Sequence, residues 1–252
     1  MTIDNDDDLQ GLKKSGRLVA DILQRMVRAA EPGMTTRELD QVGAQMMDRA
    51  GARSAPALTY DFPGATCISR NQVCAHGVPG DHVIEAGDLI NIDVSLELDG
   101  YFADTGASFC VPPVSPDIAA LCKAGRMALE RSVRQVKTGA HFNVIGRTVE
   151  SVATKRGFTV IDNLASHGVG RSLHEKPREI PTWYNKHDRR RMTEGLVFTI
   201  EPFLSTGATQ VDELDDGWSL VTPDGTLAVQ YEHTLVATRR GPIVVTQLPD
   251  AA

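Results

Sequence analysis

The chain has 252 residues, of which 41% are hydrophobic and 23% charged, and its formal net charge is -7 at pH 7. These values are typical of a soluble globular protein with a substantial core, in one large domain or two small ones. The negative charge argues against stable binding to nucleic acid or to an anionic membrane surface. The basic run KHDRRR at 186–191 is a local exception to this acidic charge. We interpret it as a solvated loop, and a contact to RNA or a ribosomal surface is the alternative.

The N-terminal stretch MTIDNDDDLQ is acidic and polar, without the basic segment and apolar run of a secretory signal. No stretch of the sequence approaches the length needed to span a bilayer. The cysteines show neither CxxC spacing nor a disulfide framework; they are Cys67, Cys74, Cys110 and Cys122. We therefore expect a cytoplasmic protein with reduced thiols, in which any metal site is built from Asp, Glu and His.

Two helices are predicted in the first part of the chain. Apolar residues recur at helical spacing over 9–30, and a Pro-Gly pair closes that segment. A second helix begins at Thr35, where Glu38 completes a capping box, and it runs to Gly51. These two segments form the first of two predicted helix pairs.

A β-hairpin is predicted over 88–105, which reads DLINIDVSLELDGYFADT. Its residues alternate between an apolar and a polar face, and the Asp-Gly pair at 99–100 is a strong signal for a two-residue hairpin loop. With that loop, Ser95 faces Asp104, and Asp93 lies diagonally across on the same face, roughly 7 to 8 Å away between backbones. The two carboxylates can therefore converge.

Like charges held this close require compensation. Neither strand of the hairpin places a Lys or Arg near Asp93 or Asp104. The two carboxylates must then share a proton, face open water or bind a cation.

A second helix pair follows the hairpin. One helix opens at Ser115-Pro116 and reaches about 136, and the next ends at Gly157. Shifting the first pair by 106 residues superposes several residues, among them Leu23 on Leu129, Arg25 on Arg131, Gly33 on Gly139 and Gly51 on Gly157. This pattern predicts a single domain, 1–252, made of two pseudo-repeats at about 9–110 and 115–246.

Strand-rich segments follow each helix pair, at 65–69, 159–162, 196–201 and 227–237, in addition to the hairpin. The order is helices, strands, helices, strands, without strict βαβ alternation. It predicts an α+β fold in which two pseudo-symmetric helix pairs cover one face of a curved, largely antiparallel sheet. Two related halves would create a cleft on their shared axis.

Further acidic and imidazole groups lie inside apolar sequence: His76 in CAHGVPG, His167 and His174 in ASHGVGRSLHEKP, Glu201 in VFTIEPF, and Glu232 and His233 in VQYEHTLVAT. Each alone has an ordinary interpretation, because a Glu before Pro is usually exposed and a His beside Gly usually lies in a loop. Together with the hairpin aspartates, however, two more strand-borne glutamates would place four carboxylates in one cleft. Divalent cations are the simplest compensation.

The predicted metal site is rich in oxygen ligands. His167 is the one obvious nitrogen ligand, and HExxH, the helix-borne zinc motif, does not occur in the sequence. Such ligation favours Mn, Fe or Co at least as much as Zn.

The segments NIDVSLELDGYFADT, HGVGRSLHEKP, FTIEP and QYEHT, taken together, resemble the signatures of type I methionine aminopeptidases. The resemblance covers about 9–246 and implies the pita-bread fold of the creatinase and aminopeptidase metallopeptidases. It further implies a monomeric hydrolase with two divalent metal ions (Co, Mn, Fe or Zn) that removes the N-terminal methionine from nascent polypeptides and prefers a small second residue. A transient ribosome contact is compatible with this role.

The resemblance also implies residue roles. Asp93 would chelate one metal, His167 and Glu201 the other, and Asp104 and Glu232 would bridge both. The remaining roles are a proton shuttle for Glu201, substrate contacts for His76 and His174, oxyanion stabilisation for His174, and a methionine pocket formed by Cys67, Phe62 and Trp218. The sequence departs from its relatives at Leu173, often Phe, and at Arg70 and Gln72, commonly Val and Glu, which leaves the shape of the pocket open.

Three alternative functions remain at this point. An X-Pro-cleaving enzyme of the same fold would normally carry an additional N-terminal domain, whereas this chain begins directly with the first predicted helix. A catalytically inactive relative that binds RNA or ribosomes would normally lack metal ligands. A metal-independent structural protein would leave the four strand-borne carboxylates without a purpose.

Overall fold

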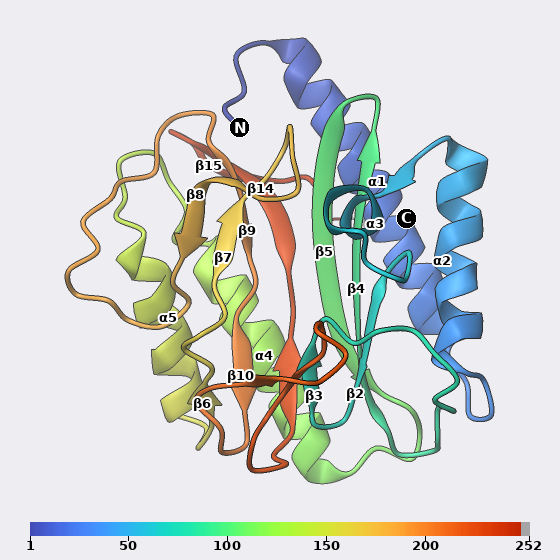
Figure 1. Cartoon of the computed structure of the whole chain (residues 1–252). Helices are drawn as coiled ribbons and strands as arrows, with labels where there is room; N and C mark the ends of the chain where they lie inside the picture. Colours follow the sequence, from blue (N-terminus) through green and yellow to red (C-terminus); the bar gives the residue numbers. More distant parts are fainter. Residues whose placement is uncertain (248–252) are drawn as a thin grey trace.

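The structure, a computed structural model, describes residues 1–247, and its long helices α1 and α4 lie behind the strands in the view of Figure 1. The helices are α1 (Asp6–Ala29), α2 (Thr36–Ala50), α3 (Ala55–Tyr60), α4 (Pro116–Val133) and α5 (Asn143–Thr154). The four long helices agree with the two predicted pairs, whereas the short α3 was not predicted. Among the described residues no helix combines the length and the apolar character that a membrane crossing requires.

The strands form two main sheets and two small ones. They are β1 (Arg53–Ser54), β2 (Cys67–Arg70), β3 (Val73–Ala75), β4 (Leu89–Leu98), β5 (Tyr101–Cys110), β6 (Thr159–Val160), β7 (Ser166–Gly168), β8 (Glu175–Ile180), β9 (Val197–Ile200), β10 (Phe203–Ser205), β11 (Asp212–Glu213), β12 (Leu220–Val221), β13 (Ala228–Gln230), β14 (His233–Thr238) and β15 (Gly241–Val244). In the first main sheet β4 pairs with β5 along one edge and with β1 and β2 along the other. The second has the order β15-β14-β9-β7-β8.

Each of these strand pairs is antiparallel, which confirms the predicted sheet type. The small sheets have the orders β13-β10-β6 and β11-β12-β3. An isolated bridge between Ala107 of β5 and Tyr231 joins the two halves of the molecule. The strands of both halves therefore meet at β5, beside the break between β13 and β14.

The helix caps explain where the first two helices begin. Asn5 accepts a hydrogen bond from the Asp8 amide at 2.9 Å, so α1 starts three residues before the predicted segment. The predicted capping box at α2 is present, because Thr35 and Glu38 bond each other's backbone amides. Gly51 ends α2 at φ 69°, in the left-handed region that favours glycine.

The helices and strands enclose separate apolar clusters in the two halves. In the first half Ile22 and Met26 of α1 are completely buried in one cluster with Ile92 of β4. In the second half Leu121 of α4 and Phe198 of β9 belong to the corresponding cluster. Burying a side chain of this size contributes roughly 1.5 to 3 kcal/mol. The helical layer thus holds the strands rigidly from one side and leaves the opposite face free for a site.

The hairpin has the predicted register. Leu98 pairs with Tyr101, and Ser95 pairs with Asp104. Asp99 and its following glycine take φ values of 54° and 83°, which is the turn that matches the twist of two paired strands. The prediction from the Asp-Gly pair is therefore confirmed.

Both glutamates lie in gaps between strands. The segment predicted at 196–201 agrees with β9, which ends at Ile200, and Glu201 lies in the gap before β10; the segment predicted at 227–237 is broken between β13 and β14, at Glu232. The gap after β9 faces the gap after β13, because the strands on either side of the two gaps pair with each other, β9 with β14 and β10 with β13. Irregular pairing re-aims side chains, which here turns both glutamates toward the same place.

The basic run at 186–191 is partly structural. Arg190 forms an ion pair with Asp188 at 2.6 Å, and Arg191 donates to the carbonyl of Gly139 at 2.6 Å. These contacts fold the loop onto the segment before α5 and favour the solvated-loop interpretation. The duplication of the two halves and the ribosome contact remain predictions.

Candidate active site

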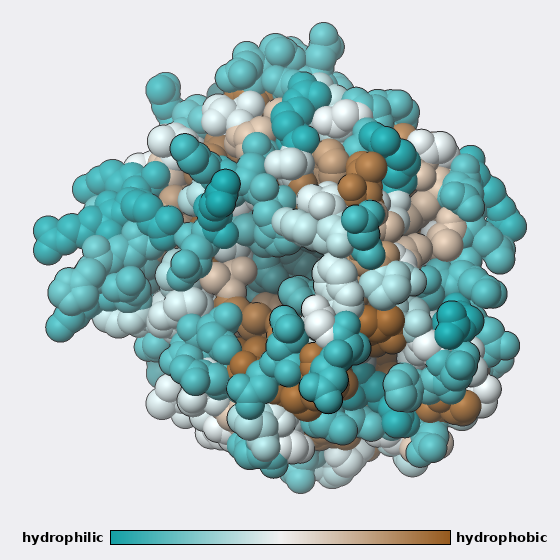
Figure 2. All heavy atoms as spheres, in the orientation of Figure 1, coloured by the Kyte–Doolittle hydropathy of each residue, from teal (hydrophilic) through white to brown (hydrophobic). Residues whose placement is uncertain are grey.

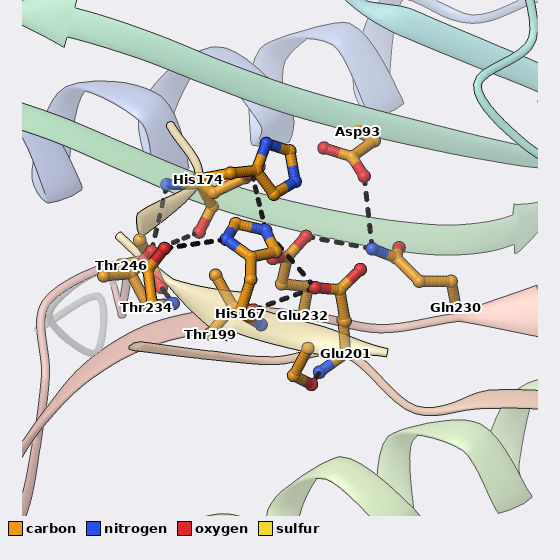
Figure 3. Close-up of polar contacts among 12 residues, drawn as sticks. Asp93, His167, His174, Thr199, Glu201, Gln230, Glu232, Thr234 and Thr246 are labelled. Carbon is orange, nitrogen blue, oxygen red and sulfur yellow. Dashed lines mark hydrogen bonds and ion pairs between the residues drawn. The ribbon is translucent and has the colours of Figure 1, made fainter. Parts of the chain in front are cut away.

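The five predicted ligands come together from both halves of the molecule, and Figure 3 labels four of them, Asp93, His167, Glu201 and Glu232. Ligand atoms of Asp104, His167 and Glu232 all lie within 4.8 Å of one another. The His167 Nε2 atom is 3.5 Å from Glu201 Oε1. Asp93 joins the group through Gln230, whose amide nitrogen donates to Asp93 at 3.3 Å and to Glu232 at 2.9 Å. The structure therefore brings the two hairpin aspartates and the two later glutamates together.

The carboxylates of this cluster are buried with little compensating charge. Asp104 is 6% exposed and Glu232 1% exposed. Burial raises the pKa of Asp104, Glu201 and Glu232 well above their usual values, and it raises the pKa of Asp93 to about 6. Within residues 1–247 the ion pairs of these groups involve His167 and no Lys or Arg. Burial lowers the pKa of His167 to about 3, so its imidazole is neutral at pH 7.

These residues fit divalent cations. Asp104 Oδ1 and Glu232 Oε1 are buried and have no hydrogen-bond partner among the described residues. A buried carboxylate oxygen without a partner is costly, and a cation would satisfy both oxygens at once. Four carboxylates and one neutral imidazole are ligands that Mn, Fe, Co and Zn accept. Of the alternatives for the hairpin aspartates, open water is excluded for Asp104 by its burial, whereas Asp93 is half-buried.

Polar residues two positions before each glutamate hold it in place. The Thr199 hydroxyl donates to Glu201 Oε1 at 2.8 Å and accepts from the backbone amide of His167 at 3.1 Å. The side-chain amide of Gln230 likewise donates a hydrogen bond to Glu232. Neither Thr199 nor Gln230 was predicted from the sequence, although strand alternation places residues i and i+2 on the same face. The available signal was that Thr199 and Gln230 each stand two residues before a glutamate, in the sequences TIE and QYE.

The side chain of Gln230 is itself fixed by its neighbours. Its Oε1 atom accepts from the Asn91 side chain at 2.9 Å. Gly106 of β5 lies directly against it, and a Cβ atom at that position would be only 2.2 Å from Gln230 Oε1. Glycine is therefore required here for the close approach of the amide, not for its backbone conformation.

A Gly106→Ala substitution is therefore expected to displace the Gln230 amide and to weaken metal binding by about 10-fold to 100-fold, the usual effect of losing a residue that orients ligands. Isothermal titration of chelator-treated protein with Mn measures the affinity. Gly80→Ala is the matched control, because a Cβ atom there would meet nothing closer than 3.9 Å. An unchanged Mn affinity in the Gly106 variant would contradict this assignment.

An apolar cavity of about 90 Å³ adjoins the acidic cluster. It is lined by Pro56, Tyr60, Phe62, Cys67, His76, Asp93, Ser95, Asp104, His167, Leu173, His174, Glu201 and Trp218. The three residues predicted for the methionine pocket are among these. The rings of Phe62 and Trp218 pack edge to face, with centroids 5.1 Å apart. In the view of Figure 2, this face of the molecule is hollowed near its centre.

The two predicted substrate histidines also line this cavity. The His174 ring lies 3.9 Å from the His167 ring, centroid to centroid. The Tyr60 hydroxyl bonds His174 Nδ1 at 2.7 Å. Desolvation in the cavity, aided by His76, lowers the pKa of His174 to about 4, so this ring is neutral at pH 7. His76 has a φ of 53°, a conformation uncommon outside glycine that is often found at functional sites.

Comparison with known proteins agrees with this geometry. The model of metallopeptidase family M24 matches residues 10–239. The chain belongs to this family. Methionine aminopeptidase 2 of Bacillus subtilis is 45% identical over 249 residues, which are 98% of this chain and 100% of the relative. A methionine aminopeptidase of Staphylococcus epidermidis is 42% identical, over 99% of this chain and 100% of the relative.

Solved structures give the same family and fold. The crystal structure of methionine aminopeptidase from Thermotoga maritima matches with a TM-score of 0.94 and 28% identity, covering 98% of this chain and 100% of that one. An X-Pro aminopeptidase from Thermotoga maritima matches with a TM-score of 0.77 and 21% identity, covering 99% of this chain but 63% of that one. The predicted pita-bread fold and the resemblance to methionine aminopeptidases are thereby confirmed.

Arg171 fixes the loop of this M24 chain that carries His174. Its guanidinium donates to Asp8 of α1 at 2.6 Å and to the hydroxyl of Tyr101 at 3.0 Å. It also donates to the carbonyl of Gly100 at 3.2 Å and lies 3.9 Å from the centroid of the Tyr101 ring. Because Asp8 and the hairpin tip belong to the first half, this contact ties the loop across the two halves. The sequence analysis did not identify Arg171.

The stability of the metal-free protein depends on pH through Asp104. Burial, with Asp93 and Glu201 nearby, raises the pKa of Asp104 well above its usual value. A carboxyl whose pKa is higher in the folded state binds its proton more tightly there than in the unfolded chain. The contribution of this carboxyl to the free energy of unfolding is therefore complete below its pKa in the unfolded chain, about 4. That contribution is lost as the pH rises through the pKa of the folded state.

Asp104→Asn removes this loss of stability at rising pH. With a chelator present, the free energy of unfolding of the variant, relative to the parent, is expected to rise with pH from about 4, by up to about 1.4 kcal/mol per pH unit. Urea unfolding of both proteins in chelator, at several pH values, measures this difference. A difference that stays constant or falls as the pH rises would contradict the burial of an uncompensated carboxylate.

Proposed function

We propose that this chain removes the N-terminal methionine from polypeptides by metal-dependent hydrolysis of the first peptide bond. The observation that carries the proposal is the position of the acidic cluster. Asp93, Asp104, His167 and Glu201 line a small cavity together with His174 and the apolar side chains of Phe62, Leu173 and Trp218. The curated relatives at 42% and 45% identity, each aligned over its full length, are named methionine aminopeptidases, which supports the same activity here.

We propose two divalent ions at this cluster. Asp93 and Asp104 would hold one ion, and His167 and Glu201 the other. Asp104 and Glu232 would bridge them, since each has a buried oxygen without a protein partner in the described chain. When bound, cations of this kind would supply an activated water, polarise the substrate carbonyl and bind the free amine of the substrate, the last of which would restrict cleavage to the first bond.

Glu201 is the proposed proton carrier. Its Oε1 atom accepts from Thr199 at 2.8 Å, while within the described chain its Oε2 atom has no protein hydrogen bond. That free oxygen is available to take a proton from water and to transfer it later to the leaving amine. The rigid hydrogen bond on one oxygen thus leaves the other available for proton transfer.

His174 is the proposed donor to the developing oxyanion. If the Tyr60 hydroxyl donates to Nδ1, the ring proton resides on Nε2. A neutral imidazole with Nε2–H donates to a carbonyl oxygen that gains negative charge, and a donor of this kind is worth more in the transition state than in the ground state. His76, which also lines the cavity, would contact the substrate backbone.

The apolar end of the cavity is the proposed methionine pocket. Phe62 and Trp218 offer ring edges and Cys67 a polarisable sulfur, all of which favour a thioether side chain. The small volume of the cavity supports a preference for substrates with a small residue after the methionine, such as Gly, Ala or Ser. N-termini of nascent polypeptides, presented in the cytoplasm to a monomeric enzyme, are the proposed substrates.

One experiment tests the proposed function. Metal is removed with a chelator, Mn, Co, Fe or Zn is added back singly, and the release of the first residue from Met-Ala-Ser and Gly-Pro-Ala is followed. We expect metal-dependent release of methionine from Met-Ala-Ser alone. Activity on Gly-Pro-Ala alone would favour an X-Pro peptidase. Activity on neither peptide, in folded protein that binds metal, would contradict an aminopeptidase function.

A further inference from the structure

A second cavity, of about 420 Å³, shares a wall with the substrate cavity. His174 lines both. The other residues of the second cavity are Met1, Thr2, Glu175, Lys176, Arg178 and Leu196. Because the proposed chemistry takes place beside His174, a substrate that leaves the first cavity at this histidine enters the second one directly.

The charge on this second cavity is positive. His174 and the two cationic residues Lys176 and Arg178 all line this cavity, and the two cationic residues belong to β8. Neither cation forms an ion pair within residues 1–247. The one carboxylate in the lining, Glu175, is already engaged by the Met1 amine at 2.5 Å and by the Arg171 amide at 3.0 Å.

Arg178 also acts on the substrate cavity itself. Desolvation raises the pKa of Tyr60, and the positive charge of Arg178 opposes that rise, which places the guanidinium near the ring that bonds His174. Two uncompensated cations beside the proposed site contrast with the net charge of -7 for the whole chain. This local field attracts carboxylates.

We propose that this second cavity is a subsite for an acidic side chain at the third or fourth residue of the substrate polypeptide, recognised by Lys176 and Arg178. The proposal rests on the proposed aminopeptidase function and adds the class of polypeptide that is processed fastest. An extended chain advances about 3.3 Å per residue, so a substrate that passes His174 brings a residue shortly after the scissile bond into the second cavity, which His174 also lines.

The opposite charge occurs beside the other histidine. Glu213 lies close enough to His76 to oppose the effect of desolvation, which lowers the pKa of that ring. Asp212, in the same short strand, is exposed as well. If the substrate left the cavity past His76 instead, basic residues would be favoured. The two routes therefore predict opposite preferences for the charge of the substrate.

Charge reversal on both enzyme and substrate tests the subsite. The substrates are Met-Ala-Asp-Gly, Met-Ala-Ser-Gly and Met-Ala-Lys-Gly, with C-terminal amides to remove the terminal carboxylate, and a second series carries the charge at the fourth residue. For the parent we expect kcat/KM to be about threefold to tenfold higher for Asp than for Lys at low salt, and this ratio to fall toward one in 0.5 M salt.

Arg178→Glu is expected to invert the Asp to Lys ratio, and Lys176→Glu to shift it in the same direction. Arg189→Glu is the control, because it makes the same change of charge on an exposed loop that lines neither cavity. This control should keep the parental ratio. Melting temperatures and the serine peptide report on folding and on catalysis independently of substrate charge.

The outcomes separate the subsite from the proposed function. A parental ratio near or below one, or a ratio that Arg178→Glu leaves unchanged while the serine peptide is still cleaved, would overturn the subsite alone. A preference for Lys would indicate the route past His76. Failure of the parent to release methionine from all three peptides would contradict the proposed function and, with it, the subsite.

Discussion

Asp104→Asn will abolish methionine release and lower the amount of bound metal. Asparagine keeps the size of the side chain but removes its charge and one of the two oxygens that can bridge cations. Because Asp104 is buried and one of its oxygens has no partner in the described chain, we expect no other group to replace it. We expect kcat/KM to fall at least about a thousandfold. Peptide assays with elemental analysis of the dialysed protein measure both effects.

A buried carboxylate in the same hairpin provides the control. Glu97 is 6% exposed, pairs with Arg53 at 2.7 Å and lies away from the acidic cluster. Glu97→Gln should lower stability while it leaves metal content unchanged. If Asp104→Asn bound as much metal as the parent and released methionine at a comparable rate, the proposed bridging role would be wrong.

His174→Gln is expected to lower kcat by about 100-fold to 1000-fold without loss of metal, the usual effect of removing one donor to an oxyanion. His174 stacks against His167 but is not a proposed ligand. We therefore expect KM to change much less than kcat. Steady-state kinetics on Met-Ala-Ser, combined with metal analysis of the same preparations, separates the two contributions.

Tyr60→Phe is the companion variant. It removes the 2.7 Å hydrogen bond to His174 Nδ1 but leaves the imidazole in place, so it should reduce kcat by a smaller factor, about 10-fold. A loss of metal in His174→Gln, or a larger effect of Tyr60→Phe than of His174→Gln, would show that the histidine acts by supporting the cluster and not by contacting the substrate.

Local sequence predicted the hairpin well because its determinants are local. The Asp-Gly pair at 99–100 fixed the register, and alternation then placed Asp93 and Asp104 on one face. The capping box at Thr35 located the start of α2 for the same reason. Both predictions depended on residues only a few positions apart.

The break at Glu232 was harder to predict than the strand end at Glu201, which Pro202 follows directly. The sequence around Glu232 is apolar and continuous, so periodicity indicates an unbroken strand. The break arises because the buried glutamate turns toward the acidic cluster, which is a tertiary effect. The short α3 was missed because a single helical turn carries too little periodicity to detect.

The supporting residues of the site were missed for two different reasons. Thr199 and Gln230 had a local signal, the i, i+2 relation to a ligand, which was not used. Arg171 had none, because its partner Asp8 is 163 positions away in the sequence and belongs to the other half of the molecule. Contacts of this kind become visible only once the two halves are placed side by side.

The central claim is that side chains from both halves of the chain hold a pair of cations. Anomalous scattering from crystals grown with excess manganese tests it most directly. We predict two peaks about 3.5 to 4 Å apart, with Asp104 and Glu232 between them and with Asp93 and His167 at opposite ends. Well-ordered density for these side chains with no anomalous peak among them would contradict the claim.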